Sequence, residues 1–117
     1  MTLREIKDLL QAEILTGEEL LDIEPTSICG SDLLSDVLAF TKEKSLLLTG
    51  LTNSQVIRTA EMSDLIGIVF VRGKRPDNAT IELATIKKIT LLTTRLPMFE
   101  SCGRLYQGGA RGCSEVK

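Results

Sequence analysis

The residues that could do chemistry occur in four short stretches, each following an apolar segment. They are Gly30-Ser31-Asp32, Thr49-Gly50-Leu51-Thr52-Asn53, Arg72-Gly73-Lys74-Arg75 and Thr93-Thr94-Arg95. Backbone N–H groups at a helix N-terminus favour an anion, and basic side chains add charge-assisted hydrogen bonds. Turns and helix caps use the same residue types, so each stretch alone also has a structural explanation. Three cations in the third stretch repel each other unless solvated or countered, which leaves a solvated turn and an anion site as the alternatives there.

We therefore expect a candidate anion site formed by glycines, hydroxyl and amide side chains, one carboxylate and two cations. Its members are Gly30, Ser31, Asp32, Thr49, Gly50, Thr52, Asn53, Arg72, Gly73, Lys74, Thr93 and Thr94. The chain has no Gly-x-x-x-x-Gly-Lys-Ser/Thr loop and no Gly-x-Gly-x-x-Gly after a strand. Nucleoside triphosphate hydrolysis and dinucleotide redox chemistry are therefore not expected.

Catalysis has little support in the residue types. The chain contains no His, which is the commonest general base at neutral pH and the commonest metal ligand. Asp32, Asp36 and Cys102 remain as candidates, but Asp32 is expected to cap a helix and Cys102 has core spacing. The acidic stretch 18–24 lacks the spacing of a calcium loop. We predict no catalytic residue, no metal site and no cofactor.

The elements that must position these residues alternate between strand and helix. Apolar residues at helical spacing predict helices at about 3–10, 33–41, 56–62, 81–86 and 97–105. Apolar or β-branched runs predict strands at 12–16, 26–29, 45–48, 66–71 and 89–93. The expected caps are Thr2 with Glu5, Ser31 or Asp32, Thr52 or Asn53, and Asp77 or Asn78.

This alternation predicts the fold class, an α/β three-layer α/β/α sandwich with a mainly parallel sheet. The run 66–71 is apolar without alternation, as expected for a strand covered on both faces. Ligands of open parallel sheets bind outside the carboxyl ends of the strands, which is where the four stretches fall. We expect a single domain over 1–107 and a flexible Gly-rich tail over 108–117.

Composition limits the partners and the compartment. The 117 residues are 43% hydrophobic and carry 14 basic against 16 acidic side chains, which argues against a dedicated nucleic-acid binder. No stretch is typical of a signal peptide or a membrane span, so a cytoplasmic protein with no membrane partner is expected. The odd set of three cysteines indicates reduced thiols. We expect Cys29 and Cys102 to be buried, inert thiols. For Cys113, in the Gly-rich tail, the alternatives are an exposed, oxidisable thiol and a thiol without a role.

Four blocks of sequence resemble the stand-alone DRTGG-domain proteins over about residues 1–107. The blocks are SICGSDLLSDVLAF at 27–40, LTGLTN at 48–53 with VIRTA at 56–60, IVFVRGKRP at 68–76, and LLTT at 91–94 with MFESCG at 98–103. The chain departs from the family pattern at Gly30-Ser31-Asp32, where relatives often carry a Gly-Asp-Arg-like turn, and at Arg72-Gly73-Lys74, where some carry Thr-Gly-Gly. The resemblance implies a fold similar to the N-terminal domain of HPr kinase/phosphorylase. It also implies a regulatory or accessory role, because relatives occur beside CBS domains in pyrophosphatases and ahead of phosphotransacetylase catalytic domains.

We therefore expect a non-enzymatic homodimer that binds an anionic small molecule, for example a nucleotide, at the carboxyl edge of the sheet. The alternative is an interaction module that packs on itself or on an enzyme partner and binds no small molecule. Its contact surface would include Leu96, Met98, Phe99 and Leu105, which core packing also explains. A minimal enzyme is the least supported hypothesis, and it would depend on Asp32 or Cys102.

Overall fold

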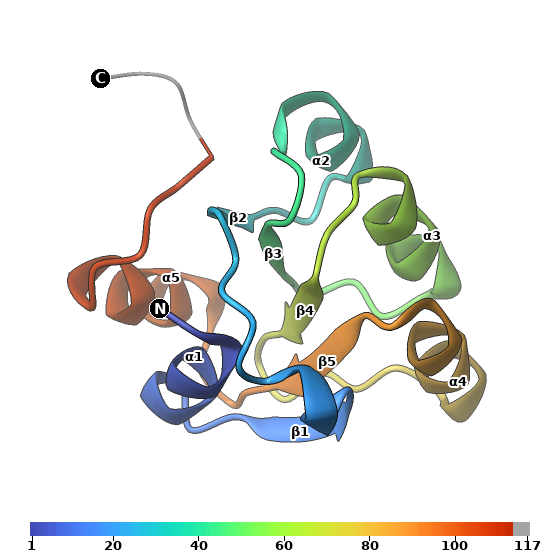
Figure 1. Cartoon of the computed structure of the whole chain (residues 1–117), viewed down its shortest axis with the longest axis horizontal. Coiled ribbons are helices and arrows are strands. Elements are labelled where there is room, and N and C mark those ends of the chain that lie inside the picture. The colour runs from blue at the N-terminus through green and yellow to red at the C-terminus, as the bar shows by residue number, and fades with distance from the viewer. Residues whose placement is uncertain (114–117) are drawn as a thin grey trace.

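The computed structural model describes residues 1–113 and shows five strands and five α-helices in one layered body (Figure 1). The elements in chain order are α1 (Leu3–Leu9), β1 (Glu13–Thr16), the 3-10 turn η1 (Glu18–Leu20), β2 (Ile28–Gly30), α2 (Leu34–Phe40), β3 (Leu46–Thr49), α3 (Ser54–Met62), β4 (Gly67–Phe70), α4 (Asn78–Lys87), β5 (Thr90–Thr93) and α5 (Met98–Gln107). Every predicted helix and strand is present, and the boundaries differ by a few residues. None of the helices within residues 1–113 is long and apolar enough to cross a membrane.

The sheet has the strand order β1-β5-β4-β3-β2. Strands β2 to β5 are parallel to one another, which confirms the predicted parallel sheet. Strand β1 instead runs antiparallel to β5, with Glu13 opposite Thr93. The first strand of the chain therefore lies at one edge of the sheet and the second at the other.

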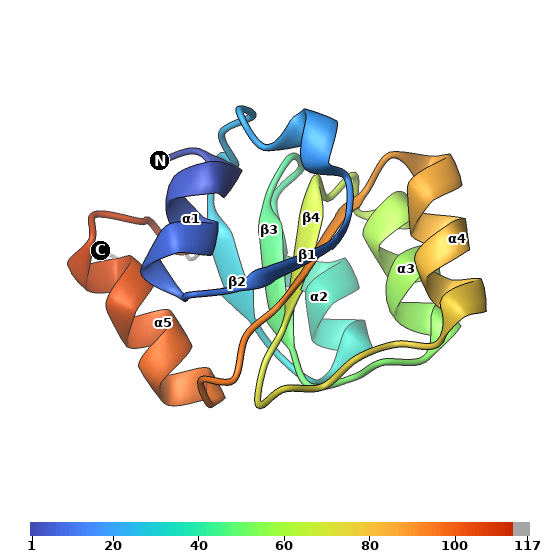
Figure 2. The ribbon, with the colours of Figure 1, turned by 90° about the horizontal axis from the view of Figure 1, so that it is seen from below.

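Helices cover both faces of the sheet, which confirms the three-layer fold class (Figure 2). Helices α1 and α5 pack on one face, over Leu46, Leu48 and Leu92. Helices α2, α3 and α4 pack on the other face, over Leu47 and Leu91 among others. Neighbouring strand residues point to opposite faces, so an unbroken apolar run fills two cores at once.

The predicted caps are confirmed for three helices. Thr2 forms a capping box with Glu5, Asn53 caps α3 and Asp77 caps α4. The cap predicted for α2 is wrong, because its N-cap residue is Leu33 and makes no side-chain hydrogen bond. Asp32 does not cap α2, because its carboxylate accepts hydrogen bonds from the loop after β3.

The two edges of the sheet differ. Strand β1 is the edge strand on one side of the sheet, and β2 is the edge strand on the other. The outer edge of β2 contacts the segment that follows α5. Ile28 forms an isolated parallel bridge with Gly112, and its N–H donates to the Arg111 carbonyl at 2.8 Å. The expected flexibility of 108–117 stays a prediction, and residues 114–117 lie outside the described part of the chain.

Candidate functional site at the carboxyl edge of the sheet

The loops that follow β2, β3, β4 and β5 gather at one edge, because these strands are parallel. The start of β1 reaches the same edge, because β1 runs the other way beside β5. This edge divides into two parts, one around Asp32 and one around Gly73.

In the first part, Asp32 ties the loop after β2 to the loop after β3. Its Oδ1 atom accepts hydrogen bonds from the Gly50 N–H at 2.7 Å and from Thr49 Oγ1 at 3.0 Å. A Cβ atom added at Gly50 would lie 3.6 Å from Asp32 Oδ1 and 4.0 Å from Arg72 Nη2. The Arg72 guanidinium therefore lies in the neighbourhood of Asp32, and the charges there are mixed.

In the second part, the turn after β4 adopts a left-handed conformation. Arg72 has a φ of 57° and Gly73 a φ of 70°. The Arg72 N–H donates to the Leu96 carbonyl at 2.9 Å, and the Gly73 N–H donates to the Thr94 carbonyl at 2.7 Å. These bonds hold the turn after β4 against the loop after β5.

A hollow of about 300 Å³ lies beside this turn. Its walls combine two guanidinium groups, one carboxylate, two hydroxyls, an amide and a glycine backbone. They are formed by Gln11, Glu13, Gly73, Arg75, Thr93, Thr94 and Arg95. The hollow therefore brings together the ends of β4 and β5 and the beginning of β1.

The two threonines of the hollow have their hydroxyl protons engaged. Thr93 Oγ1 donates to the Lys74 carbonyl and Thr94 Oγ1 donates to the Leu10 carbonyl, both at 2.7 Å. Both residues are almost fully buried. Their side chains therefore position the surrounding loops, and the other side-chain donors in the wall are the Gln11 amide and the guanidinium groups of Arg75 and Arg95.

Glu13 and Arg75 form an ion pair across the hollow's wall, with Arg75 Nη2 donating to Glu13 Oε2 at 2.8 Å. The hydrogen bond and the charge of Arg75 lower the pKa of Glu13, and Glu13 raises the pKa of Arg75 in the same way. Arg75 is therefore already bonded to a carboxylate within the wall of the hollow.

The structure separates the twelve predicted site residues into three groups. Gly73, Thr93 and Thr94 line the hollow, while Asp32, Thr49, Gly50 and Arg72 form the neighbouring part. The remaining five have other places. Gly30 packs against α5, Ser31 Oγ accepts from the Leu33 N–H, Asn53 caps α3, and Thr52 and Lys74 do not line the hollow.

Gln11 and Glu13 line the hollow but are not among the residues predicted from the sequence. They precede or begin a short strand whose direction decides which edge they reach. Arg75 and Arg95 stood in the polar stretches but outside the predicted set. Their place after buried strands was the signal that could have found them.

The catalytic candidates do not come together. Asp32 is bonded to Thr49 and Gly50, and Asp36 is exposed on α2. Cys102 lies on α5, where burial raises the pKa of its thiol. Within residues 1–113, no group of three His, Cys, Asp or Glu side chains is placed to hold a metal ion.

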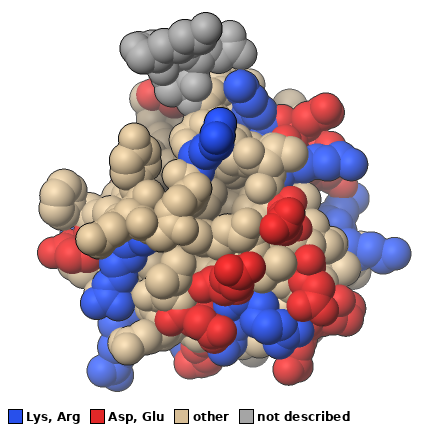
Figure 3. All heavy atoms as spheres, turned by 60° about the vertical axis from the view of Figure 1, so that its left-hand side comes forward, with Lys and Arg blue, Asp and Glu red and all other residues tan. Residues whose placement is uncertain are grey.

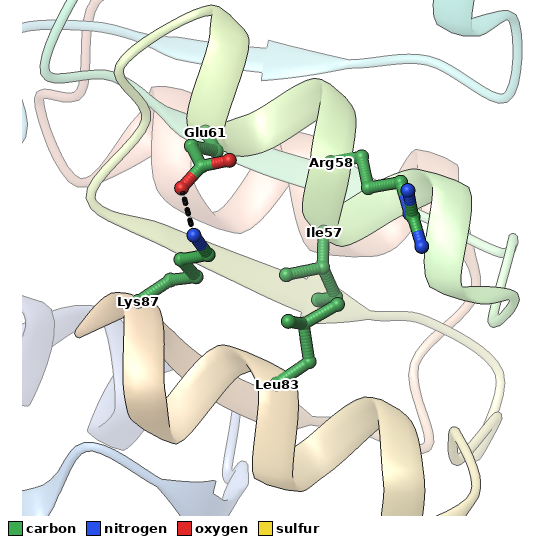
Figure 4. Close-up of a pocket in the computed structure, with 5 residues that line it drawn as sticks. All are labelled: Ile57, Arg58, Glu61, Leu83 and Lys87. Carbon is green, nitrogen blue, oxygen red and sulfur yellow. Dashed lines mark ion pairs between the residues drawn. The ribbon is translucent and has the colours of Figure 1, made fainter.

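A second hollow, of about 210 Å³, lies between α3 and α4 on the face of the molecule (Figure 4). Ile57 and Leu83 form its apolar part, and Arg58 lies beside them. Lys87 Nζ and Glu61 Oε2 bridge the two helices at 2.7 Å. None of the predicted site residues lies there, and the ion pair is a surface pair that contributes little to stability.

The interaction surface expected on the last helix is only partly accessible. Leu105 is in the core, and Leu96 and Met98 pack against that core. Phe99 is 84% exposed and Tyr106, two turns further along α5, is 77% exposed. Core packing, the other explanation given for Leu105, is confirmed, because α5 turns that side chain toward α1 and the sheet.

The fold and the site define a small α/β/α domain whose polar residues gather at the carboxyl edge of a mainly parallel sheet. The chain matches the DRTGG domain over residues 5–107 and belongs to this family, which confirms the resemblance seen in the sequence. The search of curated proteins gives no match.

A solved structure has the same fold. It is the crystal structure of the CBS and DRTGG domains of the regulatory region of Clostridium perfringens pyrophosphatase, complexed with its activator, diadenosine tetraphosphate. The TM-score is 0.78 at 21% sequence identity over 91% of the present chain. The present chain spans 46% of that structure, a little under half of its length.

Proposed function

We propose that this chain is a non-catalytic regulatory domain that binds the phosphate groups of a nucleotide at the carboxyl edge of its sheet. The observation that carries the proposal is the hollow beside Gly73, with the Arg75 and Arg95 side chains in its wall. Guanidinium groups present several donors in a fixed plane that matches phosphate oxygens. The position outside the carboxyl ends of parallel strands is the usual place for a ligand in such folds.

The comparisons support a nucleotide over other anions. The pyrophosphatase region with the same fold was crystallised with diadenosine tetraphosphate, and that ligand is its activator. By analogy, the present chain would respond to a nucleotide polyphosphate and transmit the response to an enzyme partner. A homodimer and a cytoplasmic location are part of the same proposal.

The site is suited to binding without turnover. Thr93 and Thr94 donate their hydroxyl protons to main-chain carbonyls, and the Glu13 carboxylate is paired with Arg75. The residues lining the hollow thus lack an activated nucleophile next to a general base, which covalent or acid–base catalysis would need.

The test is thermal unfolding in the presence of adenine and guanine nucleotides, dinucleoside polyphosphates, acyl phosphates and inorganic phosphate. A ligand at a hundred times its Kd adds about 2.7 kcal/mol of stability. In a domain of this size the midpoint should rise by roughly 10 °C. We expect this shift with a nucleotide, and a smaller shift with phosphate alone.

The control variants locate the site. Arg95→Ala should abolish the shift, whereas Arg58→Ala, at the hollow between α3 and α4, should leave it unchanged. Arg72→Ala combined with Lys74→Ala tests the neighbouring part of the edge. If this double variant alone loses binding, the ligand lies near Asp32 and not beside Gly73. If the protein is folded and no ligand raises its unfolding midpoint, the proposal is contradicted.

The alternative function is an interaction module, and the exposed aromatic side chains of α5 favour it. Figure 3 looks at the side of the molecule where α1 and α5 lie, and uncharged residues occupy the middle of that view. Phe99 and Tyr106 are exposed side chains of α5. Co-purification of an enzyme with the tagged chain, without any nucleotide response, would support this alternative.

A further inference from the structure

Cys29 is far from Cys102 and Cys113 in the sequence but close to both in the fold, and Cys29 and Cys113 form a pair. Cys29 lies in β2 at the edge of the sheet, and Cys113 lies in the segment that follows α5. All three cysteines are half-buried, so the burial expected for Cys29 and Cys102 is only partial, and Cys113 is not fully exposed. The segment after α5 returns along β2 and shelters the thiols.

Backbone contacts set the register of this pair. Ile28 and Gly112 form a parallel bridge, and the Ile28 N–H donates to the Arg111 carbonyl at 2.8 Å. Cys29 and Cys113 are the next residues on the two segments. Adjacent strands lie about 4.8 Å apart, which is within the Cα separations of about 4.4–6.8 Å that a disulfide bond spans.

The Cys29 and Cys113 side chains point toward each other. The Cys113 thiol lies within hydrogen-bonding reach of the Cys29 thiol. Burial first, and then the Cys29 thiol, raise the pKa of Cys113. The two sulfur atoms are therefore neighbours.

Cys102 lies on the other side of β2. A Cβ atom added at Gly30 would lie 2.9 Å from Cys102 Sγ, so the sulfur packs over Gly30 on the α5 face. Cys29 packs with the core under α2, because neighbouring strand residues point to opposite faces. Cys102 is near Cys29 but separated from it by the strand, and it serves as the internal control.

We propose that Cys29 and Cys113 form a thiol–disulfide exchange site that reacts with low-molecular-weight disulfides and, when oxidised, fastens the segment 108–113 to the outer edge of β2. The proposal is independent of the nucleotide site, because the two thiols line neither hollow described above.

The chemistry balances in two exchanges. The Cys113 thiol loses its proton, and its sulfur attacks the small disulfide, forming a mixed disulfide and releasing one small thiolate. The Cys29 thiol then loses its proton and attacks the Cys113 sulfur, forming the Cys29–Cys113 bond and releasing the second small thiolate. The two protein thiols are oxidised by two electrons, and the small disulfide is reduced to two thiols that take up the two protons.

The oxidised form has a structural consequence. A bond between residues 29 and 113 closes a loop that contains most of the chain, and long loops gain most from closure. It also keeps the outer edge of β2 covered. An uncovered strand edge offers unpaired N–H and C=O groups to any extended segment.

The test uses the full chain and oxidised glutathione as the disulfide. Wild type, Cys102→Ser and Cys113→Ser are incubated with it, digested without reduction and mapped by mass spectrometry. We expect a Cys29–Cys113 cross-link within one chain in wild type and in Cys102→Ser, and none in Cys113→Ser.

A thermal readout shows that the bond forms in the folded state. Oxidation should raise the unfolding midpoint of Cys102→Ser by roughly 10 °C and leave that of Cys113→Ser unchanged. Before oxidation both variants should unfold as wild type does, because each replaces a single half-buried sulfur atom. A Cys29–Cys102 bond, a disulfide between two chains, or glutathione adducts alone would overturn the proposal.

Discussion

At the scale of single residues, Asp32 organises the polar edge of the sheet by accepting two hydrogen bonds from the next loop. Asp32→Ala removes the acceptor of the Gly50 N–H and of the Thr49 hydroxyl. Thr49 is fully buried, so its hydroxyl is left without this partner. We expect a loss of about 1–2 kcal/mol in the free energy of unfolding, measured by urea titration.

The matched control for this loss is Asp36→Ala. Asp36 lies on the exposed side of α2, where substitutions change stability by less than about 0.5 kcal/mol. Equal losses in the two variants would show that the bonds between the two loops contribute nothing.

Glu13 is the residue that competes with an anion for Arg75. Glu13→Gln removes the negative charge, so phosphate or nucleotide affinity should rise by about threefold, measured by isothermal titration at neutral pH. Unchanged or weaker affinity would show that the ligand does not meet Arg75.

The pH dependence of this gain follows from the Glu13 pKa. Arg75 lowers that pKa below its ordinary value of 4.5, so the ion pair is complete at neutral pH and is lost as pH falls through the lowered value. Wild type and Glu13→Gln should therefore bind a fully ionised sulfate probe with equal affinity at the most acidic pH that keeps both folded. If the two proteins still differed in sulfate affinity by the same factor at low pH, Glu13 would not be competing with the anion for Arg75.

At the scale of the elements, Gly17 fixes how β1 ends beside β5. Its φ is 88°, and an added Cβ atom would lie 2.6 Å from Thr90 Oγ1 and 2.7 Å from Thr90 Cα. Gly17→Ala should therefore lower the free energy of unfolding by about 3 kcal/mol or more, because both the backbone and a buried strand would have to move.

Gly73→Ala is the control for this effect. Its φ of 70° is similar, but an added Cβ atom would meet nothing within 4 Å. Only the cost of the left-handed backbone remains, which is about 1 kcal/mol. Urea titration of both variants separates this cost from the clash.

The sequence was sufficient to predict the parallel part of the fold. The strand 66–71 is apolar on both faces and is followed by a helix that begins at its predicted cap, Asp77, so local pattern and final structure agree there. The sequence did not indicate the direction of β1, which has only four residues, one exposed and three half-buried. Glu13 and Gln11 were missed for that reason.

Competition between partners explains the errors at the site. An Asp just before a helix commonly caps it. The Asp32 carboxylate instead accepts hydrogen bonds from the Gly50 N–H and the Thr49 hydroxyl. The Thr93 and Thr94 hydroxyls were expected at the ligand, and main-chain carbonyls from distant segments take their protons. Hydrogen-bond partners this far apart in the chain cannot be predicted from the residues next to each side chain.

At the scale of the whole molecule, the aromatic side chains of α5 bear on the proposed dimer. If the chain pairs through this helix, replacing both Phe99 and Tyr106 by Ser should convert the dimer to a monomer in light scattering at micromolar concentration. Met62→Ser, on the equally exposed surface of α3, should leave the mass unchanged. A dimer that survives the double substitution would place the interface elsewhere.

The position of β1 also sets an order of assembly. A ribosome releases the chain from its N-terminus, yet the partner of β1 is β5, which ends at Thr93. Strands β2, β3 and β4 can pair while the chain is still being made, whereas the first strand to emerge must wait for the last. Glu13 lies in β1, which can pair only after β5 has been synthesised. The hollow at the sheet edge is therefore complete only when nearly the whole domain has emerged from the ribosome.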